Sequence, residues 1–438
     1  MKYLSGIQSA STNPKLLEDL YQAAQRENAA SEFKADLSAC YETSPANLLY
    51  AAWYYRLQQI PAEPQEKARK SINWKLAVPL SFLSGLALWA LSDTRLVSVR
   101  DLPYLFVYWA PVATLFALCF LALCAKTNSR RFLWIGIALA VACLYVLLLA
   151  PGQGAKEQQR YLELMIIHLP LLSWIALGLS LLGWRSKPDN RFAFLIKSIE
   201  VMITAGLYLI AGVAFGGITM GMFTALSVTL PDAIIRLIVA GGFGLLPLMA
   251  VASVYDPLTS PLSQDFSQGL SKFITTMMRL LLPMTLAILV IYVFVIPFNF
   301  MQPFINRDVL IVYNLMLFAI MGLLIGATPI RPEDLSERVQ NALRIGILAV
   351  AILAVLVSLY ALSAVIYRTV LGGITINRLT ILGWNSINIA ILALLILRQF
   401  KAGRPAWVES LRSVFSLATN AYLIWAVFLI VAVPLLFR

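Results

Sequence analysis

The sequence predicts an all-α protein: a polytopic integral membrane helical bundle of about eleven transmembrane helices, with a small helical cytoplasmic N-terminal region. Of its 438 residues, 60% are hydrophobic and only 13% are charged, whereas soluble domains carry about 25% charged residues. From Trp74 onward, apolar runs of about 18 or more residues recur, and each is long enough to cross a bilayer. The lipid bilayer is therefore the expected partner of most of the surface.

Residues 1–73 are the only extended polar part of the chain, and we expect them to form two or three short cytoplasmic helices. Asn13-Pro14 and Ser44-Pro45 each look like a helix start, with proline in the first turn. The core of this region is expected to be too small to stand alone. It is therefore predicted to lean on the membrane, on the rest of the chain or on a protein partner.

The membrane region, residues 74–438, divides by the length of its apolar runs. We place spans near 74–91, 104–125, 132–150, 161–182, 194–216, 233–252, 274–296, 309–328, 343–366, 379–397 and 417–436. The apolar run Val201 to Leu230 is too long for one untilted span. We expect its span to end near Gly217 and Ile218 to Leu230 to form an interfacial or re-entrant piece.

The orientation follows from basic residues in alternate short loops, because cytoplasmic loops are enriched in lysine and arginine. The richer set holds Lys67, Arg69, Lys70, Lys75, Lys126, Arg130, Arg131, Arg185, Lys187, Arg191, Lys272, Arg279, Arg331, Arg338, Arg344, Arg398, Lys401, Arg404 and Arg412. This predicts a multi-pass protein of the bacterial inner membrane, with a cytoplasmic N-terminus and Arg438 on the external side. The first residues do not read as a cleavable signal peptide, so the first span is expected to direct insertion.

Composition argues against several classes of function. The net charge is +12, but the basic residues lie between apolar segments instead of clustering on one surface. No nucleic acid is therefore expected as a partner. Four cysteines without a CxxC pair and a single histidine predict neither a metal site nor a cofactor. HExxH, GxSxG and P-loop motifs are absent from the sequence, and no catalytic residues are assigned.

Polar residues inside spans are the first place to look for function. Lys197 and Glu200 are three residues apart in the cytoplasmic half of the fifth span, and we expect them to form an intramembrane ion pair. A second set gathers in the external half of the bundle. It comprises Glu163, His168, Asp232, Arg236, Arg307, Asn314, Arg368, Thr375, Asn377, Arg378, Asn385 and Asn388.

Two interpretations of the external set stay open. Arginine presents a fixed fork of donors, so Arg236, Arg368 and Arg378 can bind a small anionic ligand or a lipid headgroup, with His168, Thr375, Asn377, Asn385 and Asn388 around it. Alternatively, the arginines pair with Glu163, Asp232 and Asp308 and only anchor loops. His168 and Glu163 are about 140° apart on a helix, so a buried packing role for His168 is favoured over a base.

The polar turn between the ninth and tenth spans reads Arg368-Thr-Val-Leu-Gly-Gly-Ile-Thr-Ile-Asn-Arg378. Gly372-Gly373 permits positive φ where one helix stops, and Thr375 can cap the next. Anions are favoured at that helix start. Here the chain resembles the bacterial membrane-protein family catalogued as domain of unknown function 4153, in which an arginine precedes a Tyr-Gly-Leu-Thr-Pro-Asn-Arg-like turn. Gly372 replaces the frequent tyrosine and Ile376 the frequent proline.

Leu281-Leu-Pro283 is also similar, and the resemblance covers about residues 190–400. It implies a bacterial inner-membrane helical bundle and no established activity. Transport or permeation of a small solute, whether anionic or not, is the first hypothesis for function. A non-transporting scaffold or assembly factor that recruits a partner through residues 1–73 is the second, and a membrane enzyme acting on lipid is the third.

Overall fold

The structure is a computed structural model that describes residues 3–26, 29–59, 72–98, 101–125, 129–149, 155–266 and 269–437. It is 85% helical, so the predicted all-α class is confirmed. Internal contacts divide the chain into two compact units, residues 1–71 and 72–438, here called the N-terminal unit and the membrane unit. Each unit is described by itself.

The N-terminal unit contains four helices where the sequence suggested two or three: α1 (Leu4–Ser9), α2 (Pro14–Arg26), α3 (Ala30–Thr43) and α4 (Leu48–Gln59). The predicted start at Pro14 is confirmed, and Asn13 Oδ1 caps α2 by accepting from the Leu16 amide at 3.2 Å. The predicted start at Ser44-Pro45 is wrong. Asn47 is the cap instead, because its Oδ1 accepts from the Leu49 amide at 2.9 Å.

An aromatic core holds the N-terminal unit together. Phe33 is fully buried, and its ring lies 5.5 Å from that of Tyr21 and 6.3 Å from that of Trp53. The Tyr3 amide donates to Asp36 Oδ2 at 2.8 Å, which ties α1 to α3. Large rings bury much apolar surface per residue. The unit therefore has a packed core of its own, which the sequence analysis underestimated.

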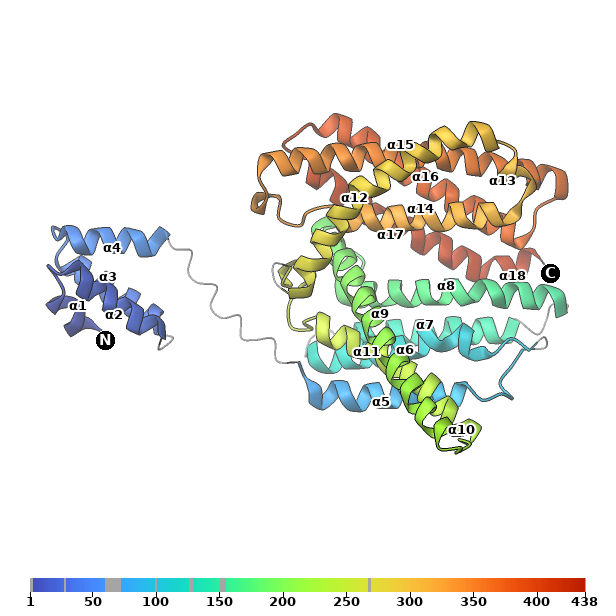
Figure 1. The fold of residues 1–438 in the computed structure, drawn as a ribbon, viewed down its shortest axis with the longest axis horizontal. Helices are drawn as coiled ribbons and strands as arrows, with labels where there is room; N and C mark the ends of the chain where they lie inside the picture. Colours follow the sequence, from blue (N-terminus) through green and yellow to red (C-terminus); the bar gives the residue numbers. More distant parts are fainter. Residues whose placement is uncertain are drawn as a thin grey trace. The chain divides into compact units, whose positions relative to one another are not determined.

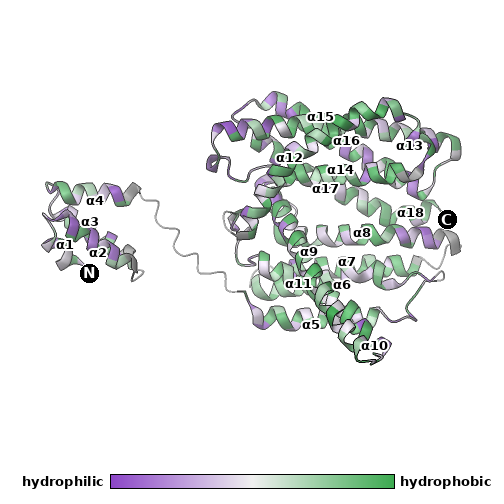
Figure 2. Ribbon diagram, in the orientation of Figure 1, coloured by the Kyte–Doolittle hydropathy of each residue, from purple (hydrophilic) through white to green (hydrophobic). Residues whose placement is uncertain are grey.

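The described part of the membrane unit contains eleven helices that are long and apolar enough to cross a membrane, as predicted. Hydrophobic residues run along these helices, and hydrophilic ones gather near their ends (Figure 2). Ten of the spans are α5 (Trp74–Leu91), α6 (Tyr104–Ala125), α7 (Ser129–Leu149), α8 (Ala155–Leu182), α9 (Pro188–Ala225), α12 (Gly269–Val295), α14 (Arg307–Ala327), α15 (Glu337–Gly372), α16 (Ile376–Ala402) and α17 (Trp407–Val431). The remaining span combines α10 (Asp232–Arg236), the π-helical turn η2 (Leu237–Gly241) and α11 (Gly242–Val254).

Helix α9 corrects one expectation. It continues through Gly217 to Ala225 as a single helix of 38 residues, so no separate re-entrant piece begins at Ile218. At 1.5 Å per residue it is about 57 Å long, well beyond the roughly 30 Å of a hydrocarbon core. Its oblique course across the other spans accommodates that length (Figure 1). Glycine is tolerated along α9, and the chain has no proline there to stop it.

Two groups of spans make up the membrane unit. Helices α5, α6, α7, α8 and α11 pack together, as do α12, α14, α15, α16 and α17, while α9 contacts α11 and α17. In Figure 1 the first group lies below the second, and the start of α5 lies at the opposite end of the spans from the C-terminus. The odd number of spans accounts for that separation.

Small residues bring α5 and α11 into close contact. A Cβ atom on Gly244 would lie 2.8 Å from Gly85 Cα, closer than side chains approach backbone. Ser84 Oγ donates to the Gly244 carbonyl at 2.8 Å across the same contact. Just before it, α10 is tied to α5 because Trp89 Nε1 donates to the Ala233 carbonyl at 2.9 Å. This packing holds the sixth span against α5.

Candidate functional site

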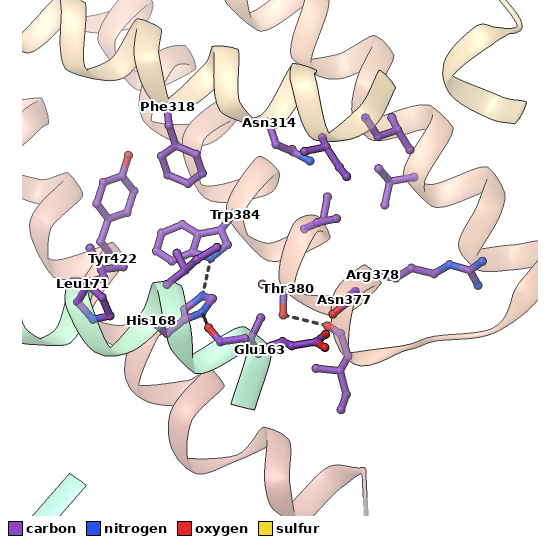
Figure 3. Close-up of a pocket in the computed structure, with 18 of the residues that line it drawn as sticks. Glu163, His168, Leu171, Asn314, Phe318, Asn377, Arg378, Thr380, Trp384 and Tyr422 are labelled. Carbon is purple, nitrogen blue, oxygen red and sulfur yellow. Dashed lines mark hydrogen bonds between the residues drawn. The ribbon is translucent and has the colours of Figure 1, made fainter. Parts of the chain in front are cut away.

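The membrane unit contains a cavity of about 1120 Å³ that is partly open to its surroundings. Figure 3 shows α8 and α14 on opposite sides of it, with α16 between them. Helices α9, α15 and α17 also contribute side chains. The cavity follows α8 from Arg160 to Trp174 and α14 from Leu310 to Ile325, a length of about 20 Å at 1.5 Å per residue. It therefore occupies about two thirds of a typical hydrocarbon thickness.

Polar and apolar residues line different ends of the cavity. Glu163, Asn377, Thr380 and Arg378 lie at one end, and Leu171, Phe318 and Tyr422 lie toward the other (Figure 3). The first, called the polar end, is lined by Arg160, Glu163, Asn314, Arg368, Thr375, Asn377, Arg378 and Thr380. The second, called the apolar end, is lined by Leu171, Trp174, Met202, Phe318, Met321, Gly322, Ile325 and Tyr422.

The predicted turn between α15 and α16 builds one wall of the polar end. Gly373 has φ +74°, the left-handed conformation that glycine adopts readily, whereas Gly372 is the last residue of α15. Thr375 caps α16 as expected, because its Oγ1 accepts from the Arg378 amide at 3.4 Å. The free N–H groups of the first turn of α16 therefore add to the positive potential at this end.

Three arginines give the polar end its charge. Arg368 Nη1 donates to the Ile305 carbonyl at 3.4 Å, and Arg378 Nη1 donates to the Gly373 carbonyl at 2.6 Å. A guanidinium carries five N–H donors, so these contacts leave donors over on each side chain. Within the described residues, neither of them nor Arg160 forms an ion pair.

The carboxylate partners weighed in the sequence do not neutralise this cluster where they are described. Glu163 lines the same end and accepts from Gln159 Nε2 at 3.0 Å. The side chains of Arg307 and Asp308 lie outside the described residues. Counting Arg160, Arg368 and Arg378 against Glu163, the described lining carries three positive charges and one negative, or +2.

His168 lines the cavity, but both of its ring nitrogens are hydrogen-bonded. Trp384 Nε1 donates to Nε2 at 3.0 Å, so Nε2 is an acceptor and Nδ1 carries the proton that is donated to the Leu164 carbonyl at 2.8 Å. This is the packing role favoured from the sequence. Glu163 and His168 both line the cavity despite the 140° between them, because the lining residues cover one broad face of α8 and these two lie at its edges.

Arg236 lies away from this cavity, contrary to its grouping with the other arginines. Its Nη2 is 3.6 Å from Asp93 Oδ2, an ion pair near the start of the sixth span. The reason is the packing of that span against α5 instead of against α8, α14 or α16. Arg236 therefore anchors α10 to α5 and is not part of the cavity lining.

Asn385 and Asn388 are buried in the bundle and do not line the cavity either. Asn388 Oδ1 accepts from the Tyr422 hydroxyl at 2.5 Å, and the ring of Tyr422 is what borders the cavity. The two asparagines were grouped with the external residues only because their span position put them in the external half of the bundle. That position does not determine whether a side chain points into the cavity or toward a neighbouring helix.

Lys197 and Glu200 form the ion pair that their spacing suggested, with Nζ 2.7 Å from Oε2. Lys197 Nζ also donates to the Asp265 carbonyl at 2.6 Å and to Ser271 Oγ at 3.1 Å, which uses all three ammonium protons. Ser271 Oγ in turn donates to Glu200 Oε2 at 2.6 Å. The network links α9 to the start of α12 and leaves no donor of Lys197 for a ligand.

Sequence reasoning missed Arg160, Trp384 and Tyr422 as lining residues. A signal for Arg160 exists, because the lining residues of α8 recur at helical spacing: Arg160, Glu163, Leu164, Ile167, His168, Leu171 and Trp174. Trp384 and Tyr422 carry no comparable signal, because aromatic residues are common throughout the spans. No protein-family model, curated protein or solved structure matches the chain. The fold and its apolar helices define a multi-pass helical membrane protein.

Proposed function

We propose that this protein lies in the bacterial inner membrane, binds an anionic solute at the polar end of the cavity and moves it across the membrane. The unneutralised arginines at that end carry the proposal. Arg368 and Arg378 reach it from the two sides of one turn, and Arg160 reaches it from α8. Arginine forks match phosphate and carboxylate oxygens. The depth of the cavity along α8 and α14 supports passage over surface anchoring alone.

The proposed orientation places the polar end outside the cell and the N-terminus in the cytoplasm. It is supported by the excess of lysine and arginine in alternate loops. Membership of the family catalogued as domain of unknown function 4153 is part of the same proposal and is supported by the Arg368–Arg378 turn. A membrane enzyme is disfavoured because both nitrogens of His168 are hydrogen-bonded.

Binding is tested with hexyl phosphate as a water-soluble anion. It should raise the thermal unfolding midpoint of the protein in neutral detergent, because a ligand that binds only the folded state stabilises it. Arg368→Gln combined with Arg378→Gln should abolish the rise. Arg338→Gln is the control, since Arg338 is exposed at the far end of α15. An unchanged rise in the double variant contradicts the proposal.

Transport is tested in proteoliposomes loaded with hexyl phosphate. Release faster than from protein-free liposomes, and reduced by the double variant, supports movement of the anion. Binding without release contradicts the transport part of the proposal and favours the second candidate below.

The second candidate function is a scaffold that recruits a partner through the N-terminal unit. The observation in its favour is that this unit has its own aromatic core around Phe33 and still exposes large side chains, including Leu48 and Tyr55. A partner held by the full chain should be lost when residues 1–60 are deleted. Recovery of the same proteins with both chains contradicts this function.

A further inference from the structure

The cavity is too large and too apolar for a small hydrated anion alone. Its 1120 Å³ exceeds the roughly 300–1000 Å³ of most small-molecule pockets. Beyond His168 and Asn314, the apolar end continues for fewer than two helical turns along α8, to Trp174, and for about three along α14, to Ile325. A water-soluble anion would leave that space without a favourable partner, whereas a hydrocarbon chain would fill it.

The apolar end is not closed off by its lining. Met202 and Phe318 at that end are 69% and 40% exposed, and Ile167 and Ile311 elsewhere in the lining are 68% and 51% exposed. All four lie within the candidate spans, where the surroundings are hydrocarbon. A chain can therefore enter sideways from the bilayer without passing through water.

We propose that the occupant of this cavity is a membrane lipid with a phosphate headgroup and a hydrocarbon chain. Its phosphate lies at the polar end with Arg160, Arg368 and Arg378, and its chain lies along the apolar end between α8 and α14. Charge complementarity selects the headgroup, and the length and lateral opening of the apolar end select the chain. The inference rests on the proposed function and adds the class of substrate.

Gly322 offers a way to test the chain separately from the headgroup. It lines the apolar end on α14, and a Cβ atom built on it meets no atom within 4 Å. Gly322→Leu therefore places a side chain into the space proposed for the hydrocarbon without touching the arginines. Gly217→Leu on α9 is the matched control, since Gly217 is equally free of neighbours and does not line the cavity.

The experiment compares inorganic phosphate, hexyl phosphate and dodecyl phosphate by the concentration dependence of the thermal unfolding midpoint in neutral detergent. Dodecyl phosphate should bind at least about tenfold more tightly than hexyl phosphate, because each buried methylene adds affinity. Dodecyltrimethylammonium, with the same chain and opposite charge, controls for partition into micelles and should give no stabilisation.

The variants separate the two parts of the ligand. Gly322→Leu should remove the preference for the longer chain and keep the binding of hexyl phosphate, whereas Gly217→Leu should resemble the unaltered protein. Gly322→Ala provides a milder variant should the leucine prevent folding, and it should weaken the preference partly. Arg368→Gln combined with Arg378→Gln should remove binding of both phosphate esters, hexyl and dodecyl phosphate.

Three results overturn the inference and are distinguishable. If dodecyl and hexyl phosphate bind equally, or if Gly322→Leu keeps the preference for the longer chain, the occupant is not a lipid, while the proposed anion site stands. If inorganic phosphate binds as tightly as either ester, the occupant is a free anion. If the arginine variant binds all three as the unaltered protein does, the proposed function fails together with the inference.

Discussion

The indole Nε1 of Trp384 in α16 donates a hydrogen bond to Nε2 of His168 in α8 across 3.0 Å. This bond joins the two groups of spans at the cavity wall. It also fixes which ring nitrogen of His168 carries the proton, because the other nitrogen must donate to the Leu164 carbonyl. The chain's single histidine is thereby held as a structural residue.

Trp384→Phe should destabilise the protein by about 1–3 kcal/mol, because the buried Nε2 of His168 loses its donor. The measurement is denaturant or thermal unfolding in detergent. Trp184→Phe serves as the control, since Trp184 is exposed and its ring lies outside the cavity. Equal stability of the two variants would show that the bond contributes nothing.

Lys197→Met should destabilise the protein by about 3–5 kcal/mol, because it leaves the buried carboxylate of Glu200 without its counter-charge. Adding Glu200→Gln to that variant removes the stranded charge and should recover part of the loss. Unfolding of the single and double variants in detergent measures both effects. A double variant no more stable than Lys197→Met contradicts the ion-pair account.

Gly244→Ala should destabilise the contact between α5 and α11 by about 1–3 kcal/mol, since its Cβ would overlap Gly85. Gly242→Ala lies in the same helix, where an added Cβ meets no atom within 4 Å. That control should be neutral or more stable by about 0.5–1 kcal/mol, the usual gain from replacing glycine in a helix. Thermal unfolding of the two variants measures the difference. A Gly242→Ala variant less stable than Gly244→Ala would contradict the close approach of α5 and α11.

Cys40 in the N-terminal unit should react slowly with maleimides in the native protein. Burial, and next the negative charge of Asp36, raise the pKa of its thiol above the ordinary 9.0. The thiolate is the reactive form, so labelling of the native protein should rise at higher pH than in denaturant. The measurement uses a variant without Cys119, Cys124 and Cys143.

The same shift has a consequence for stability. Well below pH 9.0 the thiol is protonated in both states and contributes nothing to the pH dependence of stability. As pH rises from 9.0 toward the raised folded pKa, the unfolded thiol ionises first, so the folded N-terminal unit loses stability. Identical labelling profiles for native and denatured protein would contradict the shift.

Ile374→Cys should react with a membrane-impermeant thiol reagent added outside intact cells, and Asp334→Cys should not. The two positions lie beyond opposite ends of α15, so they face opposite sides of the membrane. Both substitutions belong in a background that lacks the native cysteines. The reverse pattern of labelling would invert the proposed orientation.

The spans were predictable because each depends on local hydropathy, and the number of apolar helices follows from counting runs. The turn at Gly373 and Thr375 was predictable for a similar reason, since positive φ and helix capping involve only neighbouring residues. Such features need no knowledge of which helices meet. The uninterrupted course of α9 was missed because the apolar run Val201 to Leu230 was taken as too long for one untilted span.

The composition of the cavity was only partly predictable. Arg368 and Arg378 flank the turn that forms its wall, so local sequence was enough to group them, and both line the cavity. Arg236 and Asn385 were placed in the same external half yet face other helices, because tertiary packing of α5 and α17 determines their neighbours. Trp384 could not be distinguished from the other aromatic residues before its contact with His168 was known.

The π-helical turn at Leu237–Gly241 determines how α10 is seated. Such a turn contains one more residue than a regular helix would use over the same rise. If the same residues formed a regular α-helix, Asp232–Arg236 would be rotated by about 100° relative to α11. Arg236 would then point away from Asp93, and the Ala233 carbonyl would point away from Trp89. The attachment of α10 therefore depends on the wide turn as much as on the identity of any side chain.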